Sequence, residues 1–209
     1  MQGIVIKRIQ FLENDLLVNI LCNEGGNIQA VARGGQKFES KMAAHLEPLN
    51  LINVDLIVGK KLNYIRNIYS VKCFCELKAN IELIDIAMRA IFFINKIIKP
   101  NIENPKVLYL LFELLSILDN TELSSKIDKK LLLHLFLYKL HFIESLLPEE
   151  QDYNTYCLNE KLNSSSITYA DLNRIIKDKN LATLIHIPHV KGTITALNNY
   201  SSYFENCFV

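Results

Sequence analysis

Residues 32–41 read Ala32-Arg33-Gly34-Gly35-Gln36-Lys37-Phe38-Glu39-Ser40-Lys41, and they directly follow an alternating segment at residues 27–31. Two adjacent glycines permit backbone angles that other residues avoid, so the chain can turn sharply here or approach a ligand closely. Three cations, Arg33, Lys37 and Lys41, are spaced so that one loop could present all of them to a phosphate backbone. The pattern favours nucleic-acid binding over catalysis, and the alternative is an ordinary solvated connection between strands.

Working outward from this loop, the dominant period of the first 78 residues is two. Short alternating runs separated by Gly, Asn and Pro are typical of strands. They predict five strands, at residues 3–8, 16–22, 28–32, 49–58 and 63–75. Five short strands in so short a segment are best accommodated by a closed sheet, because closure removes exposed edges. The prediction is a five-stranded barrel of the oligonucleotide-binding (OB) type.

From about residue 77 the period changes to that of a helix. Apolar patterns bounded by proline, serine or asparagine predict helices at residues 81–98, 105–118, 124–147 and 170–179, with a loop at 149–166 and an ambiguous conformation in the last thirty residues. Helices that are apolar on nearly all sides must be buried in a bundle. We therefore expect an α+β protein with an OB-type domain at 1–78 and a helical protein-docking domain at 79–209.

Composition narrows the function classes only slightly. Half of the chain is hydrophobic and its formal net charge is +1. Residues 1–78 contain ten Lys/Arg and seven Asp/Glu and so carry +3, whereas the remainder carries −2. The positive charge therefore lies in the half with the glycine loop. Since no signal peptide or bilayer-spanning segment can be recognised, we expect a cytoplasmic protein.

Motifs for catalysis or cofactor binding do not stand out. Neither a phosphate-binding loop nor a dinucleotide fingerprint occurs, and no C-x-x-C pair suggests zinc. Cys73 and Cys75 flank Phe74, and in a strand they would share one face. They could be half of a thiolate site, but two buried small apolar residues are the favoured interpretation. We expect no enzyme activity, no cofactor and no metal.

Candidate nucleic-acid contacts are cations and aromatics of the predicted barrel. A positive groove can follow a phosphate backbone while aromatic rings stack on bases. The alternative for each aromatic residue is core packing. The candidate DNA-binding residues are Arg33, Lys37, Phe38, Lys41, Lys7, Arg8, Tyr64 and Arg66.

The order of these features resembles the bacterial RecO recombination-mediator family. The resemblance rests on Gly3-Ile4-Val5-Ile6-Lys7, Glu24-Gly25-Gly26-Asn27-Ile28, Val31-Ala32-Arg33-Gly34-Gly35, Lys37, Ser40-Lys41 and Leu46-Glu47-Pro48-Leu49. It implies binding of single- and double-stranded DNA, strand annealing, partnership with RecR and single-stranded-DNA-binding protein, help in loading RecA, and a place at the nucleoid.

Within this resemblance, Arg33, Lys37 and Lys41 take the DNA-contact role. Many family members carry a four-cysteine zinc site, of which only Cys157 falls in the matching region here. The resemblance therefore implies a helical domain without zinc. Two alternatives stay open: a protein-interaction adaptor with no direct DNA role, and an enzyme whose site is assembled from non-adjacent residues.

Overall fold

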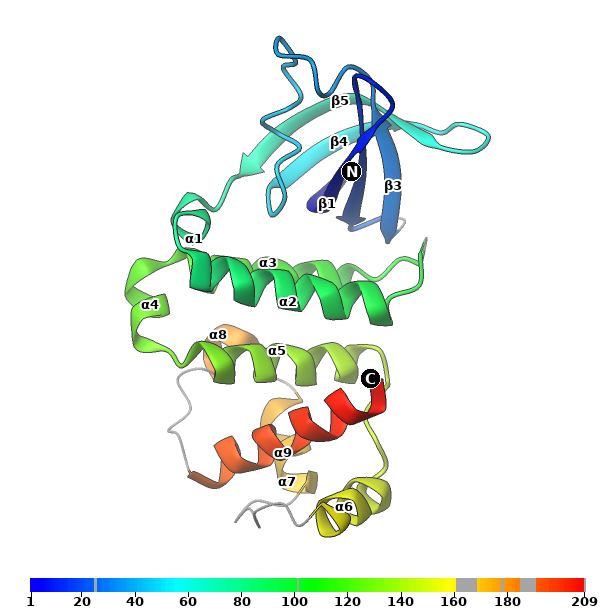
Figure 1. The fold of residues 1–209 in the computed structure, drawn as a ribbon. Coiled ribbons are helices and arrows are strands. Elements are labelled where there is room, and N and C mark those ends of the chain that lie inside the picture. The colour runs from blue at the N-terminus through cyan, green and yellow to red at the C-terminus, as the bar shows by residue number, and fades with distance from the viewer. Residues whose placement is uncertain (25, 101, 161–168, 178, 185–190, 209) are drawn as a thin grey trace. The chain divides into compact units, whose positions relative to one another are not determined.

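The computed structural model describes residues 1–24, 26–100, 102–160, 169–177, 179–184 and 191–208 (Figure 1). The chain forms two compact units, Met1–Asp119 and Asn120–Val209. The division that we predicted at residue 78 coincides with the change from strands to helices, whereas the division into compact units follows Asp119. Each unit is described by itself.

The first unit contains the predicted barrel. Its strands are β1 (Gln2–Phe11), β2 (Asp15–Cys22), β3 (Asn27–Ala32), β4 (Leu51–Ile57) and β5 (Asn63–Lys72). They close in the order β1-β2-β3-β5-β4, in which β3 and β5 are parallel and the other neighbours are antiparallel. This architecture, a closed five-stranded barrel followed by helices, confirms the predicted α+β fold with an OB-type N-terminal domain (Figure 1).

The barrel core consists of side chains from alternating strand positions. In β2 and β3, every second residue points inward because successive side chains of a strand face opposite sides. The core cluster is Val5, Leu16, Val18, Ile20, Cys22, Ile28, Ala30, Ala32, Leu46, Ile52, Val54, Ile65 and Ile68. The residues between these positions therefore form the outer surface of the sheet.

Three helices complete the first unit: α1 (Cys75–Lys78), α2 (Ile81–Ile97) and α3 (Pro105–Asp119). Asn80 caps α2 by accepting a hydrogen bond from the backbone of Glu82. The Asp119 carboxylate accepts a hydrogen bond from the Leu77 backbone at 3.2 Å and lies 3.5 Å from the Lys72 ammonium. The end of α3 is thereby tied to the segment between β5 and α2.

The second unit consists of α4 (Thr121–Lys126), α5 (Lys129–Ile143), α6 (Glu150–Asn159), α7 (Tyr169–Ile176), α8 (Leu181–Leu184) and α9 (Lys191–Phe208). The helix predicted at 124–147 is in fact two, because Asp128 interrupts it and caps α5 through the backbone of Lys130 and Leu131. The prediction of a loop at 149–166 is wrong in part, because Glu150–Asn159 form the helix α6. Residues 161–166 of the predicted loop lie outside the described residues. Across the described part of the chain, every helix is too short or too polar to cross a membrane.

Candidate nucleic-acid interface

The outer surface of β1, β2 and β3 carries a row of polar side chains. Lys7 lies opposite Asn19, and Asn19 lies opposite Gln29, so the three share one line across the sheet. The Gln29 amide donates a hydrogen bond to Asn19 Oδ1 at 3.3 Å. Asn63, at the start of β5, lies opposite the core residue Ala30 and donates to the Gln29 backbone carbonyl at 3.3 Å, so it secures the pairing of β3 with β5 and is not part of this line. A cation and two amides, of Lys7, Asn19 and Gln29, therefore lie in series on one surface.

The neighbouring row on the same surface is apolar and ends in Tyr64. The register places Ile9 opposite Leu17, Leu17 opposite Val31, and Val31 opposite Tyr64. Sheet surfaces that bind single-stranded nucleic acid combine such amphipathic rows with an aromatic platform. The described surface has both, next to each other.

Arg33 and Tyr64 are brought together by the parallel pairing of β3 with β5. The Arg33 guanidinium lies 4.5 Å from the centre of the Tyr64 ring, a cation–π contact. Arg66 lies two residues further along β5, at an irregularity where Asp55 pairs with Asn67 and Leu56 with Ile65. A β-bulge of this kind re-aims the side chain that is left out of the pairing. Arg33 and Tyr64 thus lie against each other on β3 and β5, and Arg66 is exposed two residues further along β5.

The glycine loop begins in a fixed conformation. Gly34 has a φ of 64°, and its backbone N–H donates to the Asp15 carboxylate at 2.8 Å. Gln36 donates through its side chain to the Asp15 carbonyl at 2.6 Å and through its backbone to the Asn14 carbonyl at 2.9 Å. The start of the loop is therefore held against the turn between β1 and β2, and Gly34 supplies the positive φ that this course requires.

The charged and aromatic side chains of the loop are open to solvent. Lys37 and Lys41 are exposed, and Phe38 has a relative exposure of 104%. Among the described residues, no carboxylate lies within 4.0 Å of the cationic groups of Arg33, Lys37 and Lys41. Since a large aromatic ring gains nothing from water, its full exposure between two lysines is consistent with a surface that binds a partner.

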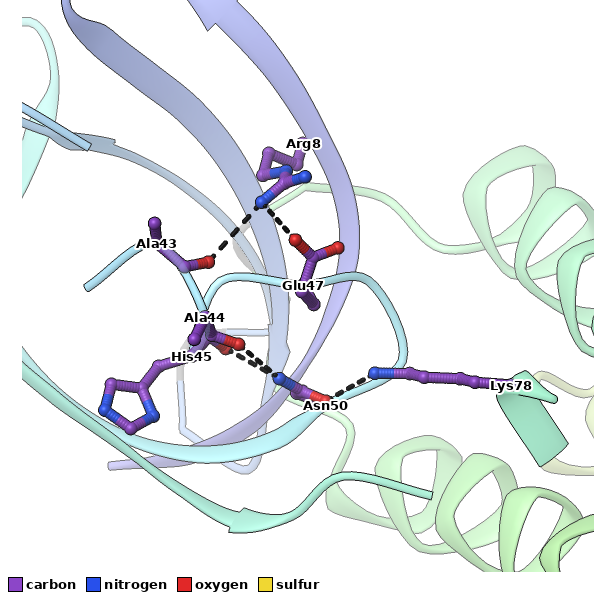
Figure 2. A network of polar contacts seen from close by, with 7 residues as sticks. All are labelled: Arg8, Ala43, Ala44, His45, Glu47, Asn50 and Lys78. Carbon is purple, nitrogen blue, oxygen red and sulfur yellow. Dashed lines mark hydrogen bonds and ion pairs between the residues drawn. The ribbon is translucent and has the colours of Figure 1, made fainter. Parts of the chain in front are cut away.

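Arg8 does not belong to this outward set. It lies opposite Val18, whose side chain is in the barrel core, so Arg8 is on the inner side of the sheet. Its guanidinium pairs with Glu47 at 2.8 Å and donates to the Ala43 carbonyl at 3.4 Å (Figure 2). Arg8 therefore holds the end of the segment that joins β3 to β4.

The same segment is held a second time by Asn50, which is 1% exposed. The Asn50 amide donates to the carbonyls of Ala44 at 3.0 Å and His45 at 3.1 Å, and its oxygen accepts from the Lys78 ammonium at 2.5 Å (Figure 2). Burial lowers the pKa of Lys78. The connection that begins with the basic loop thus ends in a network that reaches α1.

The sequence predicted the charged and aromatic residues of this surface but not the two amides of the polar row, Asn19 and Gln29. The alternation of the sequence could have indicated that both face outward, since Asn19 and Gln29 stand between core residues of β2 and β3. Strand register decides which of these positions line up, and one sequence does not give the register.

The described residues offer little geometry suited to catalysis. An open hollow beside the β1–β2 turn is lined by Gln10, Leu12, Glu13, Asn14 and Asp15, which include two carboxylates and no cation. No group of three His, Cys, Asp or Glu side chains is gathered for a metal ion within the described ranges.

Among known proteins, the barrel is similar to one family. Residues 1–74 match the family model described as "Recombination protein O N terminal". The barrel is therefore similar to the N-terminal part of RecO proteins. The match ends within the β5–α1 connection, so it covers the whole barrel, including the polar row and the basic loop.

Curated relatives named "DNA repair protein RecO" extend the similarity in part beyond the barrel. The protein from Cutibacterium acnes is 36% identical over 67 residues, which are 32% of this chain and 27% of the relative. The protein from Roseiflexus sp. is 28% identical over 145 residues, 69% of this chain and 48% of the relative. The protein from Geobacter metallireducens is 24% identical over 121 residues, 58% and 50% respectively. The chain thus spans about half the length of these RecO relatives, or less.

Proposed function

We propose that this RecO-type chain acts in DNA repair and recombination by binding DNA along the outer surface of β1–β3 and the basic loop. The observation that carries the proposal is the contact of Arg33 with Tyr64 at 4.5 Å, beside the exposed Lys37, Phe38 and Lys41. A stacked guanidinium leaves N–H groups for phosphate oxygens while the ring beneath it packs against a base.

The physical basis of the activity is charge neutralisation. Each cation that contacts a phosphate releases condensed counterions, so binding gains entropy and depends strongly on salt. A surface that neutralises two strands at once lowers their repulsion and lets complementary bases pair. Binding of single- and double-stranded DNA and strand annealing follow without covalent chemistry, and we propose a non-enzymatic role.

The partners belong to the same proposal. From the resemblance to RecO proteins we propose docking to RecR and to single-stranded-DNA-binding protein, help in loading RecA onto coated strands, and work in the cytoplasm at the nucleoid. Arg8 is proposed to act through Glu47 and Ala43 as a positioning residue for the loop, whereas Lys7 and Arg66 contact DNA from the outer surface.

The salt dependence of DNA binding tests the proposal. We expect the double variant Arg33→Ala/Lys37→Ala to bind labelled single-stranded DNA about twentyfold more weakly at 0.1 M salt, and its log–log salt slope to fall by about 1.4, because each phosphate contact contributes about 0.7. Fluorescence anisotropy across a salt series measures both quantities.

A matched control removes the same charge elsewhere in the first unit. Arg89 and Lys106 are exposed on α2 and α3, so Arg89→Ala/Lys106→Ala should leave the slope nearly unchanged. If both double variants weaken binding equally, only net charge matters and the loop is not the site. Absence of binding by the wild type at low salt would favour the adaptor.

One observation favours a second function, that of a protein-interaction adaptor. Ile81, Met88 and Phe92 lie along α2 at helical spacing and are 78%, 42% and 53% exposed. An apolar stripe of this kind is typical of a surface that contacts a protein. Co-purification of a protein partner, lost in Met88→Asp/Phe92→Asp and kept in Arg33→Ala/Lys37→Ala, would support this function.

The role of Tyr64 gives a separate prediction. Tyr64→Ala should weaken single-stranded DNA binding about tenfold, because a stacked base contributes about 1–3 kcal/mol. Tyr64→Phe keeps the ring and should bind as the wild type does. Duplex DNA, whose bases are already stacked, should lose less affinity in Tyr64→Ala, so anisotropy with both probes separates stacking from charge. Equal losses for the two probes would contradict a stacking role.

A further inference from the structure

Two exposed thiols lie on either side of Phe74, at the connection between β5 and α1. The sequence favoured buried positions for Cys73 and Cys75, and this prediction is wrong because both are exposed and free. The reason is that β5 ends at Lys72, before the cysteines. Cys22, by contrast, is fully buried in the barrel, and burial raises the pKa of its thiol to about 12.

The residue between the two thiols has an unusual backbone. Phe74 is left-handed, with φ 50° and ψ 57°, a conformation that costs a bulky residue about 1 kcal/mol or more. Its ring is 1% exposed and packs edge-on against Phe112 at 6.1 Å between centroids. The Lys72 ammonium covers the ring at 4.6 Å. The buried ring therefore holds the backbone in this conformation.

This conformation brings the flanking residues close. Helical dihedral angles of either hand at one residue place its two neighbouring Cα atoms about 5.4 Å apart. A disulfide needs a Cα–Cα distance of roughly 4.4–6.8 Å. An extended residue at position 74 would place the neighbours near or beyond the upper limit. Phe74 thus sets Cys73 and Cys75 at a separation that a disulfide can span.

The charged groups around the thiols are of both signs, since Lys72 pairs with Asp119 at 3.5 Å and Glu76 directly follows Cys75. Lys72 precedes Cys73, and Lys78 follows Cys75 by three residues. Burial lowers the pKa of Lys78, and four groups act in the opposite direction, so all four lie within electrostatic range of this ammonium: Cys73, Glu47, Cys75 and Asp119. Charge therefore does not select the reagent, and the exposure of both thiols admits a small disulfide.

We propose that Cys73 and Cys75 form a dithiol site that undergoes thiol–disulfide exchange with small disulfides of the glutathione type. One thiolate attacks a sulfur of the reagent, forms a mixed disulfide and releases one thiol of the reagent. The second thiolate then attacks the protein sulfur of the mixed disulfide, forms the Cys73–Cys75 bond and releases the second thiol. The protein loses two electrons and two protons, and the reagent disulfide is reduced to two thiols.

The test uses the full chain carrying Cys157→Ser/Cys207→Ser, so that Cys73 and Cys75 are the accessible thiols. After incubation with oxidised glutathione, intact-mass measurement should show loss of two hydrogens, with no retained glutathione, and loss of both alkylatable thiols. Adding Cys73→Ser or Cys75→Ser should give a protein that keeps one glutathione, because the resolving thiol is missing. Dithiothreitol should restore both thiols of the oxidised protein.

Other products would overturn the proposal. Retention of two glutathiones by the protein with both cysteines would mean that the thiols react independently. Absence of any reaction, while urea-unfolded protein reacts, would mean that the folded site does not take the reagent. Because Cys73 and Cys75 are exposed, serine at either position should not disturb folding, and an unchanged thermal unfolding midpoint checks this point. The inference is independent of the proposed DNA binding.

Discussion

Replacing Asn50 by alanine is expected to lower the free energy of unfolding of the first unit by about 3 kcal/mol. The Asn50 amide holds two backbone carbonyls, of Ala44 and His45, and its oxygen accepts from Lys78. Alanine would leave these groups without their partner in a place that is 1% exposed. A buried polar group left unsatisfied costs about 1–3 kcal/mol, and a charged one costs more.

Urea denaturation followed by circular dichroism measures this loss. Asn67→Ala is the matched control, because Asn67 is an exposed asparagine of the same barrel and its replacement should cost less than about 0.5 kcal/mol. Trypsin provides a second measurement: in Asn50→Ala, cleavage after Lys37 and Lys41 should accelerate under native conditions because the far end of their segment is released. If Asn50→Ala and Asn67→Ala behaved alike, the network in Figure 2 would contribute no stability.

The barrel could be predicted because its signals are local. Alternation in β2 and β3 and the turn residues around Asn27 act over a few residues, and closure follows from the need to pair every edge. The network around Asn50 could not be predicted, since its partner Lys78 is 28 residues away and is selected only by the fold.

The candidate site was predicted in part, and the limit has a physical cause. Arg33 and the loop lysines were recognisable from charge and glycine alone. Lys7 and Arg8 looked equivalent in the sequence, but an irregularity between Val5 and Lys7 shifts the pairing of β1. As a consequence Lys7 lies opposite the outward Asn19, whereas Arg8 lies on the inner side. A one-residue shift reverses the face of every following side chain, and no pattern in the sequence predicts where the shift occurs.

The helical half was less predictable for a related reason. A polar run such as that of α6 lacks the apolar periodicity that indicates a helix, yet Tyr153 within it is buried and donates to the Ala196 carbonyl at 3.2 Å. Contact with α9 therefore stabilises α6, whose own sequence favours a helix only weakly. Tertiary packing outweighs local propensity there.

The second unit should lose stability in acid through His141. This side chain is fully buried in α5, its Nδ1 shares a hydrogen bond with the Tyr200 hydroxyl at 2.7 Å, and its ring lies 3.5 Å from that of Phe204 between centroids. Burial lowers the pKa of His141 from 6.5 to about 3. Burial also raises the pKa of Tyr200, so its hydroxyl keeps its proton throughout this range.

The direction of the effect follows from proton uptake. Below pH 6.5 the unfolded chain binds a proton at His141 while the folded unit does not, so folding becomes less favourable as the pH falls from 6.5 toward 3. At pH 4.5 the loss is about 3 kcal/mol, since each pH unit in this window costs about 1.4 kcal/mol. Above pH 6.5 both states hold a neutral imidazole and His141 contributes no pH dependence.

Comparison with His141→Gln isolates this contribution from the carboxylates, which titrate in both proteins. Glutamine can still accept from Tyr200 but does not titrate. Urea unfolding at pH 7 and pH 4.5, followed by the near-ultraviolet signal of the packed tyrosines, should show a smaller acid-induced loss in the variant by about 3 kcal/mol. Equal losses in the two proteins would mean that His141 is protonated in the folded unit. The buried imidazole, packed among Tyr200 and Phe204, would then have to be accessible to water, contrary to the packing described here.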